Sequence, residues 1–174
     1  TMKVWVLLPA YNEEKSLERL LPKIDLAFKQ KGMNYIIVVV NDGSSDGTQS
    51  VLEANLSSYP IQIINHKINR GLGETERDGF EFIAEHSVMD DIIIRIDCDD
   101  THEPEYFFRL IDKLNEGYDV VSASRFQTGG GQVGVDGYRA FISYCANLFM
   151  KLVFHIPGIK DYSCGYRAYR AIVI

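Results

Sequence analysis

Short apolar runs alternate along the chain with segments whose apolar residues recur at helical spacing. The apolar runs predict strands at Lys3–Leu8, Tyr35–Val40, Ile61–Ile64, Asp91–Ile96 and Asp119–Ala123. The helical spacing predicts helices at Glu13–Lys31, Thr48–Leu56, Leu72–Glu85, Pro104–Glu116 and Tyr138–Phe154. Strands this apolar are typical of a mainly parallel sheet that is covered by helices on both faces. The pattern therefore predicts an α/β domain.

Polar, mostly acidic motifs follow several of these strands directly. They are "PAYNEE" at Pro9–Glu14, "NDGSSDGT" at Asn41–Thr48, "DCDDT" at Asp97–Thr101 and "SRF" at Ser124–Phe126. Each motif alone has a plain structural interpretation: Asn12 would cap the first helix, and Asp46 would serve the turn and cap of the second. Their shared position is more informative, because such sheets bind ligands at the carboxyl ends of their strands. The motifs together predict a ligand site along one edge of the sheet.

Composition narrows the range of partners. The chain has 174 residues, is 46% hydrophobic and carries a net charge of −6, which suits one ordinary domain and disfavours a nucleic-acid surface. Its cysteines, Cys98, Cys145 and Cys164, show no CxxC spacing, which favours a reducing, cytoplasmic compartment. Neither a signal-peptide pattern nor a membrane-length apolar run is present. The chain stops on the apolar run "YRAIVI", so we expect the natural protein to continue beyond it.

The segment "DCDDT" crowds three carboxylates after a buried strand. Asp97 and Asp99 are two residues apart, so in an extended segment they would point to the same side. Their mutual repulsion would be relieved by a divalent cation, and Mg²⁺ or Mn²⁺ prefers such hard oxygen ligands. We therefore assign the metal to Asp97 and Asp99, a cap of the next helix to Asp100, and a spacer role to Cys98.

Basic residues gather in the second half of the chain. Arg125 follows the last predicted strand, and Arg139 and Ser143 are four residues apart on one helix face. Arg167 and Arg170 lie in "GYRAYR", and we interpret Arg170 as a surface charge. Because a guanidinium donates two parallel hydrogen bonds to phosphate, these arginines predict a second phosphate site.

The segment Tyr138–Phe154 carries a broad apolar face. That face consists of Tyr138, Phe141, Ile142, Cys145, Leu148, Phe149 and Leu152. A face this broad favours a helix buried in the core. The alternative is a helix that lies on a membrane surface, with Lys151 and His155 near its end.

Taken in order, six segments resemble one enzyme family. They are "LLPAYNEE", "VVNDGSSDGT", "NRGLGE", "RIDCDDTHEPE", "SASRF" and "DYSCGYRAYR". They resemble the inverting family 2 glycosyltransferases, and more narrowly the dolichyl-phosphate mannose and polyprenyl-phosphate sugar synthases, from Val4 to Arg170. The resemblance implies the GT-A fold, a Rossmann-like three-layer sandwich. It implies one catalytic domain over residues 1–174, with a nucleotide-binding half at 1–100 and an acceptor-binding half at 101–174.

The resemblance also implies roles for single residues. The nucleotide would be bound by Pro9, Ala10, Tyr11, Glu13, Asp42, Arg70, Gly71, Asp97 and Cys98. The acceptor phosphate would be bound by Arg125, Arg139, Ser143 and Arg167. Asp99 would act in catalysis through the metal, and Asp161 stands beside the acceptor site. Departures from the family pattern at Glu74 and Thr75 leave the identity of the sugar open.

The implied reaction moves a sugar from a GDP- or UDP-linked donor to a polyprenyl or dolichyl phosphate. It would use Mg²⁺ or Mn²⁺, invert the anomeric carbon, and occur in the cytoplasm or peripherally on the cytoplasmic face of a membrane. If the acceptor is instead a sugar hydroxyl, a carboxylate base is needed, and Asp161 is the candidate. A processive polysaccharide synthase is disfavoured, because the chain's one tryptophan, Trp5, lies in the first strand and outside any Gln-x-x-Arg-Trp motif.

Two other classes compete with a transferase. The chain could be a nucleotide-sugar-binding module that performs no transfer. "DCDDT" also matches Asp-x-Asp-x-Thr, the nucleophile motif of haloacid-dehalogenase-type phosphatases, with Asp97 as nucleophile. That motif usually follows the first strand, whereas here it follows the fourth, so the phosphatase is the remoter alternative.

Overall fold

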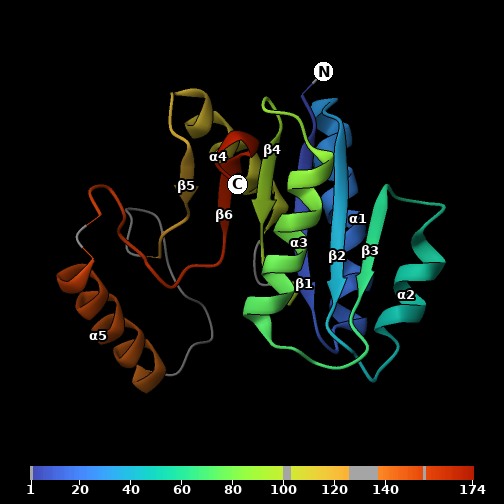
Figure 1. Ribbon diagram of the computed structural model, residues 1–174, viewed down its shortest axis with the longest axis horizontal. Coiled ribbons are helices and arrows are strands. Elements are labelled where there is room, and N and C mark those ends of the chain that lie inside the picture. The colour runs from blue at the N-terminus through green and yellow to red at the C-terminus, as the bar shows by residue number, and fades with distance from the viewer. Residues whose placement is uncertain (1, 100–102, 126–136, 155) are drawn as a thin grey trace. The chain divides into compact units, whose positions relative to one another are not determined.

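The computed structural model describes residues 2–99, 103–125, 137–154 and 156–174, without the side chains of Arg139 and Ala140 (Figure 1). These residues form two compact units: Thr1–Val121 with Tyr166–Ile174, and Ser122–Gly165. The division into a nucleotide-binding half at residues 1–100 and an acceptor-binding half at 101–174 stays a prediction about function, and its boundary differs from that of the units.

The first unit is built on a six-stranded sheet with the order β3-β2-β1-β4-β6-β5. Its strands are β1 (Val4–Ala10), β2 (Tyr35–Asn41), β3 (Ile61–Asn65), β4 (Ile92–Arg95), β5 (Val120–Ser122) and β6 (Arg167–Arg170). β1 pairs in parallel with both β2 and β4, and β2 pairs in parallel with β3. β6 pairs antiparallel with β4, so the sheet is mixed but mainly parallel, as predicted.

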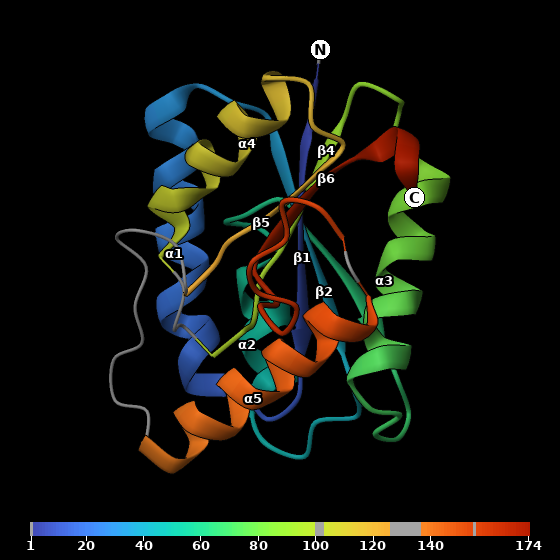
Figure 2. The same ribbon diagram turned by 90° about the vertical axis from the view of Figure 1, so that its left-hand side faces the viewer.

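Helices cover both faces of this sheet. They are α1 (Glu14–Lys31), α2 (Thr48–Asn55), α3 (Leu72–His86) and α4 (Phe107–Asn115), with a short 3-10 turn, η1 (Pro104–Tyr106), before α4 and another, η2 (Ala171–Val173), after β6. Figure 2 shows α1 and α4 on one face of the sheet and α3 on the other. The predicted three-layer α/β arrangement is confirmed.

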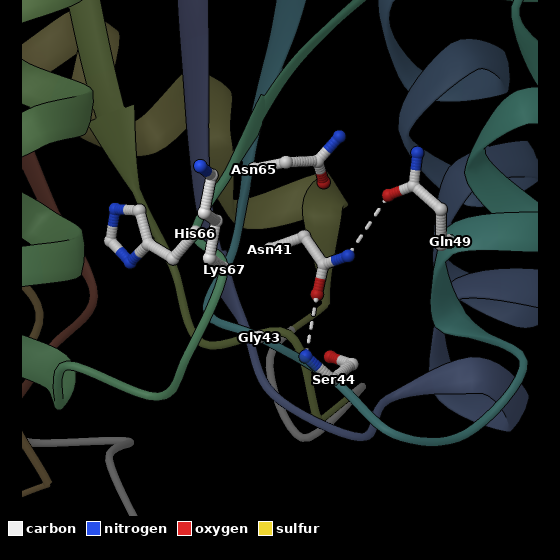
Figure 3. Close-up of a pocket in the computed structure, with 7 residues that line it drawn as sticks. All are labelled: Asn41, Gly43, Ser44, Gln49, Asn65, His66 and Lys67. Atoms are coloured by element: carbon white, nitrogen blue, oxygen red, sulfur yellow. Dashed lines mark hydrogen bonds between the residues drawn. The ribbon is translucent and has the colours of Figure 1, made fainter.

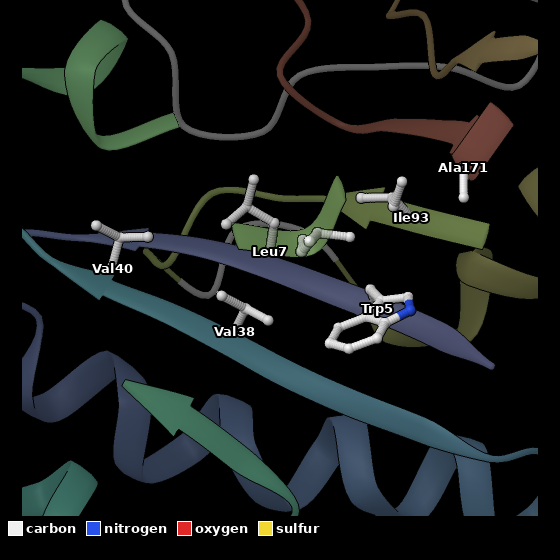
Figure 4. Close-up of a cluster of buried hydrophobic side chains, with 7 residues drawn as sticks. Trp5, Leu7, Val38, Val40, Ile93 and Ala171 are labelled. Carbon is white, nitrogen blue, oxygen red and sulfur yellow. The ribbon is translucent and has the colours of Figure 1, made fainter. Parts of the chain in front are cut away.

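The core lies between the sheet and these helices. Every residue of β1 is buried, which is the pattern of a strand with helices on both of its faces. On the α3 side a cluster of buried side chains joins strands and helix (Figure 4). Its members are Trp5, Leu7, Val38, Val40, Ile83, Ile93 and Ala171. Burial of a side chain of this size contributes roughly 1.5–3 kcal/mol, so this cluster fixes the strands whose ends carry the polar motifs.

The strand β6 is absent from the sequence-based prediction. Arg167 and Arg170 alternate with more apolar neighbours, and the segment is too short and too charged to stand out as a strand. The interpretation of Arg170 as a plain surface charge is wrong, because its Nη2 donates to the Leu114 carbonyl at 2.6 Å, near the end of α4.

Candidate active site

The polar motifs of the first unit meet at one edge of the sheet. β1 lies between β2 and β4, and the chain runs from β1 outward through β2 to β3 before it returns to β4 on the other side of β1. The carboxyl ends of such neighbouring parallel strands form the usual ligand crevice of an open α/β sheet. The ends of β1, β2 and β4 lead into Tyr11, Asp42 and Asp97, respectively. The predicted donor residues therefore follow neighbouring strands.

The loop after β1 is tied to the loop after β2. Asn12 has a left-handed backbone, with φ of 57°, so the prediction that it caps α1 is wrong. The capping acceptors come instead from the second loop: Thr48 Oγ1 accepts the Glu13 N–H at 2.9 Å, and Asp46 Oδ2 accepts the Glu14 N–H at 3.2 Å. Asp46 Oδ1 also accepts the Thr48 N–H at 3.0 Å, which confirms its predicted turn-and-cap role. These bonds couple two of the predicted nucleotide loops.

Of the predicted residues after β1, Pro9 and Ala10 are buried in the strand itself, and Tyr11 is exposed. Glu13 occupies the N-cap position of α1. The exposed Tyr11 ring at this edge is available to a ligand, whereas Pro9 and Ala10 can offer a ligand mainly their backbone.

Asp42 organises the turn before α3. Its Oδ1 accepts the Arg70 N–H at 2.8 Å, and its Oδ2 accepts the Gly71 N–H at 2.9 Å. His66 Nδ1 lies 2.6 Å from Asp42 Oδ1. Burial works to raise the pKa of the Asp42 carboxyl, but these hydrogen bonds outweigh burial and lower that pKa below its ordinary value. The structure thus brings the predicted nucleotide residues Asp42, Arg70 and Gly71 into direct contact.

His66 connects this turn to helix α3. Its side chain is 4% exposed, and its Nε2 lies 3.0 Å from Asp78 Oδ2. Asp78 Oδ2 also accepts a hydrogen bond from Arg70 Nη1 at 2.6 Å, and Arg70 Nη2 donates to Glu74 Oε2 at 2.7 Å. A neutral imidazole carries one N–H, so the ring can donate to both Asp42 and Asp78 only when both of its nitrogens carry protons. His66 and Asp78 are site residues that the sequence reasoning missed.

Replacement of His66 by alanine is expected to destabilise the protein by about 2 kcal/mol, because two carboxylates lose a buried, charge-assisted partner. Thermal unfolding monitored by circular dichroism measures this loss. The matched control is His86→Ala, at an exposed histidine in the last turn of α3, where we expect little change. Equal effects of the two substitutions would contradict the bridging role of His66.

Gly43 lets the loop after β2 approach the backbone of Ile68 closely. Its φ is +68°, and a Cβ there would lie 2.5 Å from the carbonyl carbon of Ile68. Only glycine fits both the backbone conformation and the space. Gly43 therefore holds the loop after β2 against the segment that leads to Arg70.

A polar pocket of about 370 Å³ lies at the ends of β2 and β3 (Figure 3). Its described lining residues are Asn41, Gly43, Ser44, Gln49, Asn65, His66 and Lys67. The Asn41 amide is held in place, because it donates to Gln49 Oε1 at 2.9 Å and accepts the Ser44 N–H at 3.2 Å. The pocket shares His66 with the Asp42 network, but its described lining includes none of the predicted nucleotide residues.

The segment after β4 differs from the extended geometry that the sequence suggested. β4 ends at Arg95, and Cys98 and Asp99 lie in a turn, so strand alternation does not put Asp97 and Asp99 on one face. Asp97 is partly exposed, Cys98 is buried and Asp99 is exposed. Asp97 Oδ1 lies 2.6 Å from Nη1 of the buried Arg95, another residue that the sequence reasoning did not assign to the site.

The two carboxylates still suit a divalent cation. Among residues outside the undescribed stretches, no three His, Cys, Asp or Glu side chains cluster closely enough to hold a metal ion. A site with one or two carboxylates is nevertheless typical of Mg²⁺ that is bound together with substrate phosphates. Asp97 and Asp99 supply hard oxygens at the sheet edge where a donor diphosphate is expected, so the residues fit the ion.

The second unit contains an arginine–carboxylate pair in which the carboxylate is buried and the arginine is partly exposed. Arg125 Nε donates to Asp161 Oδ2 at 2.7 Å, and its Nη2 donates to Asp161 Oδ1 at 3.0 Å. Asp161 is 1% exposed, and burial works to raise the pKa of its carboxyl, but the bonds from Arg125 and Ser163 outweigh burial and lower that pKa. Arg125 Nη1 lies 3.5 Å from Ser143 Oγ. The structure thus joins Arg125 and Ser143, two of the predicted acceptor residues.

Helix α5 (Gly137–Val153) directs its polar face toward other residues of the second unit. Ser143 contacts Arg125, and Asn147, four residues on, is buried and bonds the Lys160 carbonyl and the Tyr162 N–H. Its large apolar side chains are exposed, and they are Tyr138, Phe141, Ile142, Tyr144, Leu148, Phe149, Leu152 and Val153. The expectation of a core helix with a buried apolar face is therefore wrong.

The other two predicted acceptor residues are Arg139 and Arg167. Arg139 belongs to α5, but its side chain is outside the described part of the structure. Arg167 belongs to the first unit, where β6 sets it opposite Arg95.

Almost the whole sequence matches one protein-family profile. The profile, described as "Glycosyl transferase family 2", matches residues 5–173. The chain belongs to glycosyl transferase family 2. That membership confirms the resemblance seen in the motifs, and it excludes the phosphatase alternative for "DCDDT".

Three curated relatives of this family 2 chain have names that refer to a phosphorylated polyprenol or dolichol. A dolichol-phosphate mannosyltransferase of Pyrococcus furiosus is 34% identical over 174 residues, which cover 99% of this chain and 47% of the relative. A polyprenol monophosphomannose synthase of Mycolicibacterium smegmatis is 30% identical, over 100% of this chain and 64% of the relative. An undecaprenyl-phosphate 4-deoxy-4-formamido-L-arabinose transferase of Shewanella sediminis is 33% identical, over 98% and 49%. The chain thus spans about half to two thirds of these relatives.

Solved structures of other glycosyltransferases share the fold. Mannosyl-3-phosphoglycerate synthase of Rubrobacter xylanophilus has a TM-score of 0.73 at 17% identity, over 98% of this chain and 54% of that one. Glucosyl-3-phosphoglycerate synthase of Mycobacterium tuberculosis, in complex with Mn²⁺, UDP and its product, has a TM-score of 0.69 at 20% identity, over 98% and 57%. The predicted GT-A fold of this family 2 chain is confirmed.

Within the described residues, no helix of this family 2 chain combines the length and apolar character that a membrane crossing requires.

Proposed function

We propose that this family 2 chain transfers a sugar, with inversion, from a GDP- or UDP-linked donor to a polyprenyl or dolichyl phosphate. The proposal adopts for this chain the kind of acceptor named in its 30–34% identical relatives. The observation that carries it lies in the second unit, where Ser143 of α5 contacts Arg125, a residue suited to phosphate, while the large apolar side chains of the same helix are exposed. A lipid phosphate needs both kinds of surface.

The donor would bind at the carboxyl edge of β1, β2 and β4. The Asp42 network holds the turn at Arg70 and Gly71, and Tyr11 offers an exposed ring beside it. Asp97 and Asp99 would hold Mg²⁺ or Mn²⁺, which when bound supplies positive charge that stabilises the departing diphosphate. We expect the donor's base and sugar to be selected by contacts at this sheet edge, where the Asp42 network fixes the backbone.

The acceptor would be bound in the second unit. A lipid phosphate is already ionised at neutral pH, so it needs positioning and charge compensation more than a base. Arg125 is pre-oriented for that task, because Asp161 holds two of its nitrogens and directs Nη1 to the side of Ser143. Binding then costs little additional side-chain entropy.

The geometry of Asp161 favours the lipid phosphate over a sugar hydroxyl. A hydroxyl acceptor requires a base within hydrogen-bond reach of its proton. Asp161 is 1% exposed, is paired with Arg125, and has a lowered pKa, each of which makes it a poor base. We therefore propose that Asp161 anchors Arg125, and the hydroxyl acceptor remains the alternative that the following experiment tests.

The test is a panel of labelled GDP- and UDP-sugars with Mn²⁺ and one of three acceptors. The acceptors are a polyprenyl phosphate, the same polyprenol without phosphate, and a free monosaccharide. We expect label in the lipid fraction with the polyprenyl phosphate alone. Transfer to the monosaccharide would favour the hydroxyl alternative, and binding of nucleotide without any transfer would favour a binding module.

The exposed apolar side of α5 is expected to contact the membrane that carries such an acceptor. The double substitution Phe149→Ser and Leu152→Ser, at two exposed positions, should lower co-sedimentation with phospholipid vesicles about tenfold or more. The matched control is Leu26→Ser, at an exposed leucine on α1 in the first unit. Unchanged vesicle binding in the double variant would contradict a membrane-facing α5.

A further inference from the structure

Arg95 is a buried cation next to the proposed metal ligands. It ends β4 and is 4% exposed. Its Nη2 lies 2.5 Å from Glu76 Oε1 on α3, and its Nη1 lies 2.6 Å from Asp97 Oδ1. Placing a guanidinium between two carboxylates at the end of an apolar strand carries a desolvation penalty, because the charge is removed from water.

The guanidinium is also incompletely hydrogen-bonded. Arg95 Nε and Nη1 are buried without a hydrogen-bond partner, since the approach of Nη1 to Asp97 has an ion-pair distance but not the alignment of a hydrogen bond. Opposite charges this close attract whatever their alignment, so we regard the pair as electrostatic. Asp97 is thus held by charge, without a directional bond from Nη1 that would fix its orientation.

A second arginine stands beside the first. The register of β4 and β6 sets Arg167 directly opposite Arg95, so both side chains leave the sheet on the same face. Two like charges in this position repel, and the carboxylates of Glu76 and Asp97 offset that repulsion. The segment that carries Asp97 and Asp99 therefore borders fixed positive charge.

We propose that Arg95 is a positioning residue that holds Asp97 and weakens the binding of a divalent cation to the protein alone. The inference rests on the proposed metal site at Asp97 and Asp99. A cation must compete with Arg95 for Asp97 and is repelled by the same guanidinium. The ion is held firmly only when the donor diphosphate adds its own oxygens and charge, so ion and nucleotide bind and leave together.

The test is a titration with Mn²⁺ in the absence of nucleotide, followed by electron paramagnetic resonance of the free ion. Removal of one nearby positive charge in Arg95→Met is expected to tighten Mn²⁺ binding about tenfold. Arg95→Lys, which keeps the charge, should stay close to wild type. Arg109→Met removes an exposed arginine on α4 and controls for net charge. Equal Mn²⁺ affinities of Arg95→Met and wild type would overturn the inference.

Two further variants keep the inference and the proposed function apart. Glu76→Gln, at a partly exposed position, removes one of the two carboxylates paired with Arg95 and leaves the charge of Arg95 less compensated. It should therefore weaken Mn²⁺ binding several-fold, even if Arg95→Met fails to fold. Asp99→Asn should abolish Mn²⁺ binding. If it does so while both Arg95→Met and Glu76→Gln bind like wild type, the inference alone fails. If Asp99→Asn binds Mn²⁺ normally, the proposed metal site is wrong, and the inference that rests on it is wrong as well.

Discussion

Replacement of Asp99 by asparagine is expected to lower the rate of sugar transfer about 100- to 1,000-fold, with the fold intact. Asp99 is exposed in the turn after β4, so its loss removes little packing. What it removes is a charged oxygen ligand at the edge where the diphosphate leaves. Loss of one such charge-stabilising group is worth about 3–4 kcal/mol in the transition state, and each 1.4 kcal/mol is a factor of ten.

Two measurements separate this effect from a general defect. The rate is followed with a labelled nucleotide sugar at several Mn²⁺ concentrations, and folding is followed by thermal unfolding. Asp90→Asn changes an exposed aspartate just before β4 and should leave the rate unchanged. Full metal-dependent turnover in Asp99→Asn would show that Asp99 is not a ligand of the metal ion.

Replacement of Arg125 by methionine is expected to have two large effects at once. It leaves Asp161 buried without its counter-ion, which should destabilise the second unit by about 3 kcal/mol. It also removes the cation proposed for the acceptor phosphate, so transfer to polyprenyl phosphate should fall at least 100-fold, by the loss of a charge-assisted contact. Thermal unfolding and the transfer assay measure the two effects separately.

The double variant Arg125→Met with Asp161→Asn distinguishes a structural role from a functional one. The neutral asparagine needs no counter-ion, so stability should largely return. Transfer should not return, because the guanidinium is still missing. If the double variant regains both stability and transfer, Arg125 serves only to satisfy Asp161, and the acceptor assignment is wrong.

The pairing of Arg125 with Asp161 also determines the direction in which the stability of the folded protein changes with pH. The pKa of Asp161 is lowered in the folded protein, so its stabilising contribution is present above the ordinary aspartate pKa and is lost as the pH falls through the lowered folded value.

The sheet was predictable because its strands are continuously apolar. Runs such as "YIIVVV" have one stable environment, between two helical layers, and their order along the chain implies a parallel sheet. β6 was missed because its alternation of arginine with Ala168 and Tyr169 becomes a strand only through pairing with β4, more than 70 residues away in the chain. Pairings between distant segments leave no local pattern.

The site shows the same division. The motifs after β1, β2 and β4 were visible as polar groups at strand ends, and the structure places them on neighbouring strands. His66, Asp78 and Arg95 were not assigned to it, because a histidine or arginine at a strand end has no special meaning until its carboxylate partners are known. The helical period of α5 gave the positions of its apolar side chains, but it could not tell which side of the helix would face inward.

The most direct test of the account is the structure of the reaction product. An α-linked nucleotide sugar from the active panel is incubated with Mn²⁺ and polyprenyl phosphate, and the lipid product is analysed by proton and phosphorus nuclear magnetic resonance. The account predicts a sugar joined through its anomeric carbon to the lipid phosphate in the β configuration. A retained α configuration, or a sugar attached to a hydroxyl, would contradict it.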